Sequence, residues 1–267
     1  MNEVGFNNEQ MKLQLRYDAL KERVANQLEM LHMLVTTAGP NIKARYMMFI
    51  GRLEFQAYEL KIEVRRWKRR LEMRQAALNR GEAPNHEMIE AMLEREFAEY
   101  LDMIAQHAQE LKEASERFAA KSLSNEEDTA VRVAYLNAVK KLHPDLNPGL
   151  PKAAQNLWNE IQSAYDARDW EAVRLLAALV DGVVSGENEF AAATDVVAAL
   201  HEACERLEAK SRELAEKTKE IKSSVPFTYE AFLKDEDAVK ERQNELKEIV
   251  AELNAKIKKY EEAWNNG

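Results

Sequence analysis

Residues that interrupt helices are scarce in this chain, since only 8 glycines and 6 prolines occur among its 267 residues. Such scarcity, together with many Ala, Glu, Lys, Leu and Arg residues, favours long helices over sheets. We find no strand-length segment of alternating polarity and no period of the length typical of helical repeats. The sequence therefore predicts an all-α protein.

Cysteine is almost absent, because Cys204 is the single one. One cysteine excludes an intrachain disulfide and a cysteine-based zinc site, and it suits a reducing cytoplasm. The chain also lacks an excess of positive charge, since its formal net charge is −9. An acidic chain is not built for bulk attraction to nucleic acid or to an anionic membrane.

Long hydrophobic runs are missing as well. The most apolar run, residues 175–184, is interrupted by Asp181 and Gly182 and is far too short to span a bilayer. The N-terminal residues MNEVGFNNEQ have no basic start and no apolar segment, so we expect no secretory signal. Because 46% of the residues are hydrophobic, the chain has enough apolar side chains to form a buried core, and we expect a folded cytoplasmic protein.

Most of the chain is predicted to form five long helices, each with one apolar seam at alternating three- and four-residue spacing. The glycines and prolines between them give the expected ranges 8–37, 41–79, 85–121, 186–222 and 235–264. Gly39-Pro40 is expected to end the first helix. An aromatic cluster at 227–232 is expected to form one helical turn before the last helix.

Charge predicts how two of these helices pair. Residues 41–80 hold eleven Lys/Arg against four Glu, a balance of +7, whereas residues 81–130 hold thirteen Asp/Glu against four Lys/Arg, a balance of −9. A short turn between helices of similar length also favours an antiparallel hairpin. By the same reasoning, 186–222 and 235–264 should form a second hairpin. The predicted fold is thus a pair of long antiparallel coiled-coil hairpins flanking a small helical unit, with regions 1–122, 123–182 and 183–267.

The central region is organised around a loop that concentrates prolines and glycine. Pro144 disfavours helical geometry at His143, so the preceding helix should stop there. Pro151 lies near the first turn of the next helix, a favoured place for proline. The two flanking helices carry apolar faces and should pair antiparallel, followed by a turn and a fourth short helix within 166–176. His143, Pro144 and Asp145 should therefore form a stiff loop at the tip of a helix pair.

These residues carry a family resemblance. Residues 135–145, YLNAVKKLHPD, followed by Asn147-Pro148, resemble the second helix and loop of a J domain, and residues 158–165, WNEIQSAY, resemble its third helix. A bare His-Pro-Asp is a weak signal, but here both halves agree at the right separation over about residues 124–170. The first J-domain helix has no clear match, and we expect the end of the 85–121 helix to replace it.

The resemblance implies a co-chaperone that performs no chemistry itself. In J domains the loop and the basic face of the preceding helix dock on an ATP-loaded DnaK-class chaperone and promote its ATP hydrolysis. Carried over to this chain, the chaperone-binding residues are His143, Pro144, Asp145, Lys140, Lys141 and Arg132. We therefore expect no enzyme activity, no catalytic residue, no cofactor and no metal site. The long helices would position an unknown client or self-associate through coiled coils.

Other interpretations stay open at this point. A coiled-coil scaffold with a vestigial J-like tip would show the same pattern. The basic stretch 61–74 is a candidate for binding RNA or DNA, but Trp67 within it falls on the apolar seam and an acidic helix follows, so we expect nucleic-acid binding to be absent. The remaining histidines form no i,i+4 pair, which argues against a metal site. Cys204 lies on a seam and is expected to pack there.

Overall fold

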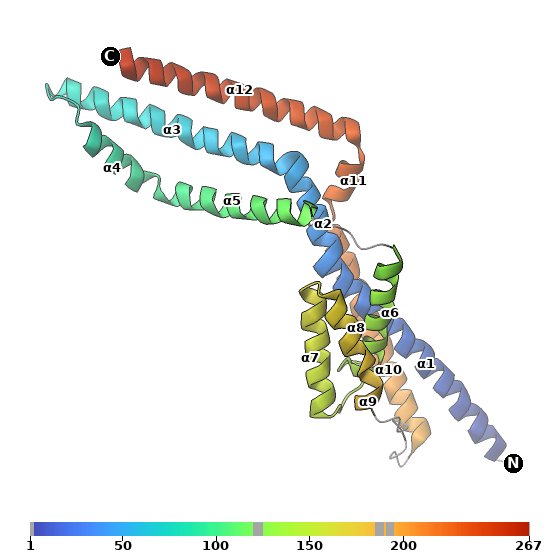
Figure 1. Cartoon of the computed structure of the whole chain (residues 1–267). Helices are drawn as coiled ribbons and strands as arrows, with labels where there is room; N and C mark the ends of the chain where they lie inside the picture. The colour runs from blue at the N-terminus through green and yellow to red at the C-terminus, as the bar shows by residue number, and fades with distance from the viewer. Residues whose placement is uncertain (1–2, 120–124, 185–189, 191–194, 267) are drawn as a thin grey trace. The chain divides into compact units, whose positions relative to one another are not determined.

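The computed structural model describes residues 3–119, 125–184, 190 and 195–266, and the regular elements among these residues are all helices (Figure 1). The predicted all-α class is confirmed. The chain divides into two compact units, the first of residues 1–39 and 121–225 and the second of residues 40–120 and 226–267. Each unit combines distant segments, so the division differs from the three consecutive regions we expected. The expected boundary at 122 lies outside the described residues.

The N-terminal part of the chain is helical without a break from Glu3 to Asn79. Its elements are α1 (Glu3–Met33), the π-helical η1 (Leu34–Ala38), α2 (Gly39–Tyr46), the π-helical η2 (Met47–Gly51) and α3 (Arg52–Asn79). The prediction that Gly39-Pro40 ends a helix is therefore wrong. The N–H of Gly39 bonds to the carbonyl oxygen of Leu34, five residues back. This wider turn relieves the clash that a proline ring makes with a preceding carbonyl in a regular helix.

In the first unit, α1 packs along α10 and also contacts the shorter helix α6. The elements other than α1 are α6 (Asn125–Leu142), α7 (Lys152–Asp166), α8 (Trp170–Ala178), α9 (Val180–Val183) and α10 (Val196–Ser223). The turn and the short helix expected within 166–176 are present, as the turn at Ala167 and Arg168 and helix α8. The principal neighbours of α6 are α1, α7 and α8. The described end of the 85–121 helix, α5, belongs to the second unit, so the expectation that it takes the place of a first J-domain helix stays a prediction.

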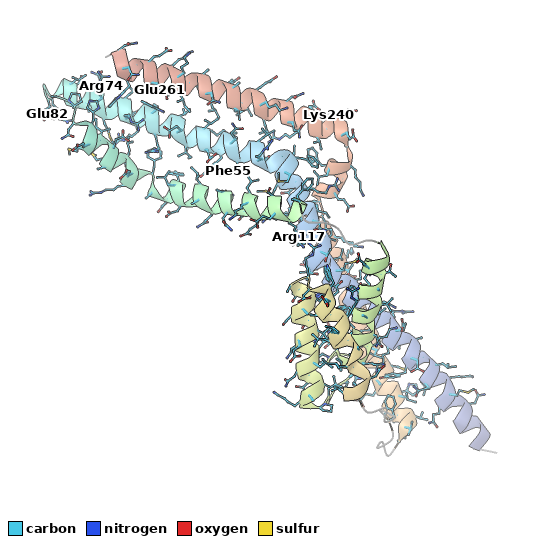
Figure 2. The ribbon with its side chains drawn as sticks, in the orientation of Figure 1. Phe55, Arg74, Glu82, Arg117, Lys240 and Glu261 are labelled. Carbon is cyan, nitrogen blue, oxygen red and sulfur yellow. The ribbon has the colours of Figure 1, made fainter. Side chains whose placement is uncertain are left out.

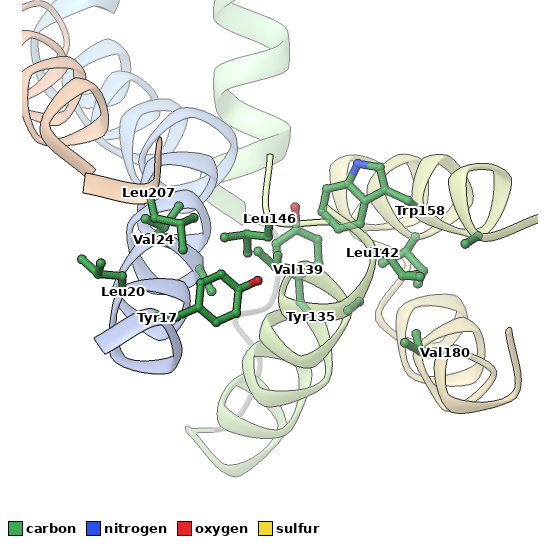
Figure 3. Close-up of a cluster of buried hydrophobic side chains, with 14 of the residues drawn as sticks. Tyr17, Leu20, Val24, Tyr135, Val139, Leu142, Leu146, Trp158, Val180 and Leu207 are labelled. Carbon is green, nitrogen blue, oxygen red and sulfur yellow. The ribbon is translucent and has the colours of Figure 1, made fainter. Parts of the chain in front are cut away.

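One apolar core joins the helices of this first unit (Figure 3). The long helices contribute Tyr17, Val24 and Leu207, and the shorter helices contribute larger side chains around them. The latter include Tyr135, Leu142, Trp158 and Ile161. Because the same core continues from α1 and α10 into α6 and α7, the end of α6 is held against both long helices.

In the second unit, α3 lies between the C-terminal helix α12 and the pair α4 and α5. These elements are α4 (His86–Glu96), α5 (Ala98–Ala119), α11 (Tyr229–Lys234) and α12 (Glu236–Asn266). The helix expected at 85–121 is divided at Phe97, whose buried ring packs with Ile62, Ile89 and Leu93. α11 is the helical turn expected from the aromatic cluster.

The two C-terminal long helices have different principal partners. α10 packs along α1, and α12 packs along α3. These helices belong to different units, so the expected hairpin between 186–222 and 235–264 is not confirmed and stays a prediction. α10 also begins later than expected, because Asp195 caps it by accepting hydrogen bonds from the N–H groups of Val197 and Ala198 at 3.0 Å. An apolar seam indicates that a helix has a buried face, but not which helix covers it.

Candidate functional site

The loop His143-Pro144-Asp145 follows directly on the last residue of α6, where Pro144 predicts the end of the helix. The backbone N–H groups of Leu146 and Asn147 both donate to the carbonyl oxygen of His143 at 3.0 Å. The N–H of Asp145 donates to Nδ1 of His143 at 3.1 Å. The triplet is therefore a closed turn, bonded to itself, at the end of a helix.

Two side chains beyond the triplet fasten this turn to the helix. The amide group of Asn147 donates to the carbonyl oxygens of Lys140 and His143 at 2.9 and 3.3 Å. Leu146 is fully buried in the core of the first unit (Figure 3). Pro144 stays exposed. The loop thus presents a fixed surface, and little conformational entropy remains to be lost when a partner binds it.

His143 is half-buried, with its ring edge-on to Trp158 at a centroid distance of 5.2 Å. Burial lowers the pKa of His143; the carboxylate of Asp145 acts against this, and Lys210 adds to it. The neutral ring therefore predominates at pH 7. Because Nδ1 accepts the N–H of Asp145, the neutral tautomer carries its proton on Nε2. His143 thus offers a ring N–H donor rather than a positive charge.

Two of the expected basic docking residues contact acids on α1. The guanidinium of Arg132 donates to both carboxylate oxygens of Glu29 at 2.9 and 3.1 Å. The side chain of Glu29 is only 5% exposed, so Arg132 neutralises a carboxylate inside the unit. Nζ of Lys140 lies 2.5 Å from Oε2 of Glu22, and this hydrogen bond lowers the pKa of Glu22.

The remaining charged docking residues are paired as well. Lys141 donates a hydrogen bond to the carboxylate of Asp181 in α9. Lys210 of α10 lies 2.9 Å from Oδ2 of Asp145 and 3.2 Å from Oε2 of Glu213. Burial disfavours the charged form of Lys210, but its hydrogen bonds to Asp145 and Glu213 outweigh this and raise its pKa. Each charged member of the expected docking set therefore contacts an opposite charge of the first unit.

Sequence reasoning missed these partners. Glu22 and Glu29 are one heptad apart on α1, and Arg132 and Lys140 are two turns apart on α6, so the spacings of the acids and the bases match. That match is a usable signal only when α1 is known to lie beside α6. The sequence contains many such acid and base spacings on its long helices.

Helices α6 and α8 line a groove in the first unit. This groove has a volume of about 670 Å³, and its lining residues include Val133, Leu136, Ala177, Asn137, Lys140 and Arg174. Val133 is 63% exposed. No carboxylate lines the groove among the described residues.

The basic stretch 61–74 of α3 is largely engaged within the second unit. Arg70 donates to both carboxylate oxygens of Glu90 at 2.5 and 2.9 Å and lies over the ring of Trp67, 4.2 Å from its centroid. Arg74, which is labelled in Figure 2, donates to the carbonyl oxygen of Trp264 at 2.6 Å. These contacts reduce the positive charge that the stretch offers to a phosphate backbone.

The other candidate residues have packing roles. His32 stacks on Tyr135 and meets Tyr165 edge-on, with ring centroids 5.1 and 4.9 Å apart. Cys204 is buried, and burial raises the pKa of its thiol. Over the described ranges, no cluster of three or more His, Cys, Asp or Glu side chains has the arrangement of a metal site. Within the same ranges, no helix has the length and apolarity needed to cross a membrane.

The candidate site is therefore a rigid polar turn between α6 and α7, with charged side chains on both sides of it. Its charges are balanced by α1, α9 and α10. Comparisons of the chain with models of protein families, with curated proteins and with solved structures gave no significant match.

Proposed function

We propose that this chain is a J-domain-type co-chaperone, as the resemblance of residues 124–170 implies. The loop His143-Pro144-Asp145 docks on an ATP-loaded DnaK-class chaperone and stimulates its ATPase, and the chain itself catalyses no reaction and needs no cofactor. The observation that supports this proposal is the position of the triplet, at a rigid tip between two packed helices with Lys140 and Lys141 in the preceding turn.

The electrostatics of the tip support docking on an acidic partner. The side chains of Lys140 and Lys141 are 33% and 39% exposed, so their ammonium groups retain contact with water. Partly exposed lysines beside a fixed loop steer an approaching acidic surface and fix its orientation. Arg132 is the weakest member of the set, because its guanidinium already neutralises the buried Glu29.

The long helices supply the second half of the proposed function, the positioning of a client or partner. We propose an antiparallel coiled-coil hairpin made of α3 with α4 and α5, supported by the contacts among these helices. Large apolar side chains on α4 and α5 are well exposed, including Met88 at 61%, Phe118 at 49% and Met103 at 44%. Exposed apolar side chains of this kind mark surfaces that bind other proteins or a second copy of the chain.

A second candidate function is a coiled-coil scaffold whose J-like tip no longer docks. One observation favours it: the charges of the tip are already balanced by the chain's own helices. The two candidates differ in one property, because only a co-chaperone changes the ATPase rate of a DnaK-class chaperone.

The test is a single-turnover ATPase assay of a purified DnaK-class chaperone, with and without the full chain. The wild type should accelerate hydrolysis, and His143→Gln should abolish the acceleration because the loop loses its ring contact with Trp158 and the acceptor for the N–H of Asp145. His201→Gln, the same change at an exposed histidine of α10, is the matched control and should behave as the wild type.

Two results decide against docking. Acceleration that is equal in the wild type and in His143→Gln would mean that another surface acts on the chaperone. No acceleration by the wild type, together with light scattering that shows a stable oligomer, would leave the scaffold as the function.

A further inference from the structure

The docking loop is enclosed by charges from the long helices α1 and α10. We propose that these two helices form an intramolecular latch, in which Glu22 pairs with Lys140 and Lys210 pairs with Asp145 until a chaperone displaces Glu22 and Lys210. The inference rests on the proposed function, since it describes the regulation of the same docking site. The ion pairs Lys140–Glu22 and Lys210–Asp145 are called the latch pairs below.

The latch pairs are placed by the packing of α1 along α10 and by the packing of α1 on α6. Glu22 reaches the loop from α1, and Lys210 reaches it from α10. Lys21, the neighbour of Glu22, also donates to Oδ1 of Asn147 at 2.9 Å. Both sides of the His-Pro-Asp turn are thus contacted by the same helix pair.

The latch residues Glu22 and Lys210 carry the same two charges that a docking partner has to supply. A surface that binds Lys140 presents a carboxylate, and a surface that binds Asp145 presents a cation. Glu22 and Lys210 present the same two groups at 2.5 and 2.9 Å. Binding of a chaperone and closure of the latch therefore compete for the same atoms.

The latch pairs are suited to exchange because water reaches them. Their four side chains are between 23% and 52% exposed, and ion pairs with this exposure contribute little net stability. The neighbouring pair of Arg132 with Glu29 is different, because the Glu29 side chain is 5% exposed. The latch pairs can therefore open while the helices stay packed, whereas Arg132 stays engaged and does not join the docking surface.

The test uses the full chain and two double variants. The release variant Glu22→Gln/Lys210→Gln removes one charge from each latch pair and keeps the size of both side chains. The control variant Glu208→Gln/Lys217→Gln removes the same charges from two other ion pairs, one of which joins α1 to α10 through Arg16. The release variant should reach half-maximal ATPase stimulation at a roughly two- to thirtyfold lower concentration, the factor expected for two exposed ion pairs.

Outcomes of this assay separate the latch from the proposed function. The control variant should match the wild type, and adding His143→Gln to the release variant should abolish stimulation. If the wild type stimulates in a His143-dependent way but the release variant shows no gain, the latch is wrong and the co-chaperone function stands. If neither stimulates, the proposed function fails and the latch fails with it.

A second measurement tests the latch without a chaperone. The N–H groups of Leu146 and Asn147, which bond to the carbonyl oxygen of His143, report how often the loop opens. Their hydrogen exchange should be about two- to thirtyfold faster in the release variant, with unchanged far-ultraviolet circular dichroism. Exchange at the wild-type rate would overturn the latch, because the latch pairs would then not hold the loop.

Discussion

Arg132 offers the clearest distinction between a docking residue and a structural one. The change Arg132→Met keeps an unbranched apolar stem but removes the two hydrogen bonds of 2.9 and 3.1 Å to Glu29. The carboxylate of Glu29 then stays in the unit at 5% exposure without the guanidinium that balances it. The free energy of unfolding should fall, because an uncompensated charge remains desolvated.

The size of this loss follows from the two exposures. Removing one partner of a fully buried ion pair lowers the free energy of unfolding by about 3–5 kcal/mol. Removing one partner of an exposed pair lowers it by about 0.2–1 kcal/mol. The Glu29 side chain is buried but the Arg132 side chain is 45% exposed, so we expect a loss of about 2 kcal/mol. The matched control is Lys141→Met, whose partner Asp181 is 74% exposed, and its loss should stay below about 1 kcal/mol.

Urea titration followed by circular dichroism and tryptophan fluorescence measures these losses. Because the chain has two units, the transitions are fitted separately rather than as one two-state step. The double variant Arg132→Met/Glu29→Met should recover part of the loss, since no isolated carboxylate then remains. Equal losses for Arg132→Met and Lys141→Met, or no recovery in the double variant, would refute the structural role of Arg132.

Three further predictions concern the core and the titrating groups of the first unit. Leu142→Ala should lower the free energy of unfolding by about 2–5 kcal/mol, because Leu142 is fully buried. Val133→Ala, at an exposed position, should lower it by less than about 0.5 kcal/mol. Similar losses for the two variants in urea titrations would contradict the assigned core. Burial lowers the pKa of His32 and His143 below 6.5, so their contribution to the free energy of unfolding is fully present above that pH and is lost as the pH falls. The double variant His32→Gln/His143→Gln should flatten this pH dependence in thermal melts. A melting temperature that declines toward high pH instead would exclude histidine protonation as its cause. Cys204 should react slowly with a thiol reagent at neutral pH in the folded chain and rapidly in urea, because burial raises its pKa; fast labelling of the folded chain would show that the thiol is accessible.

Features that depend on neighbours along the chain were predictable from the sequence. Pro144 predicts the end of α6, and α8 follows the turn at 167–168 as the residues there indicate. The failure at Gly39-Pro40 shows the limit of such local rules. There the π-helical η1 changes the hydrogen-bond register before the proline, and the helix continues. A breaker predicts a break only when no wider turn accommodates it.

The pairing of helices was not predictable in the same way. The seams of 186–222 and 235–264 suggested that these helices cover each other, but α10 packs along α1 and α12 along α3. The hydrophobic effect is non-directional, so it does not specify which apolar surface covers a given seam. Because many helices of this chain carry similar seams, several helix pairings are compatible with the same sequence pattern. Loop length was the only local guide, and it did not identify the partners.

Sequence alone was enough to predict that the chain is helical and where the His143-Pro144-Asp145 turn begins, because both depend on backbone preferences of residues close in the chain. The contacts of Glu22 with Lys140 and of Lys210 with Asp145 could be found only in the folded structure. Those contacts join segments far apart in the sequence, and they exist because one core packs α1 and α10 against the end of α6. The surroundings of the loop are thus a property of the packed unit rather than of the motif.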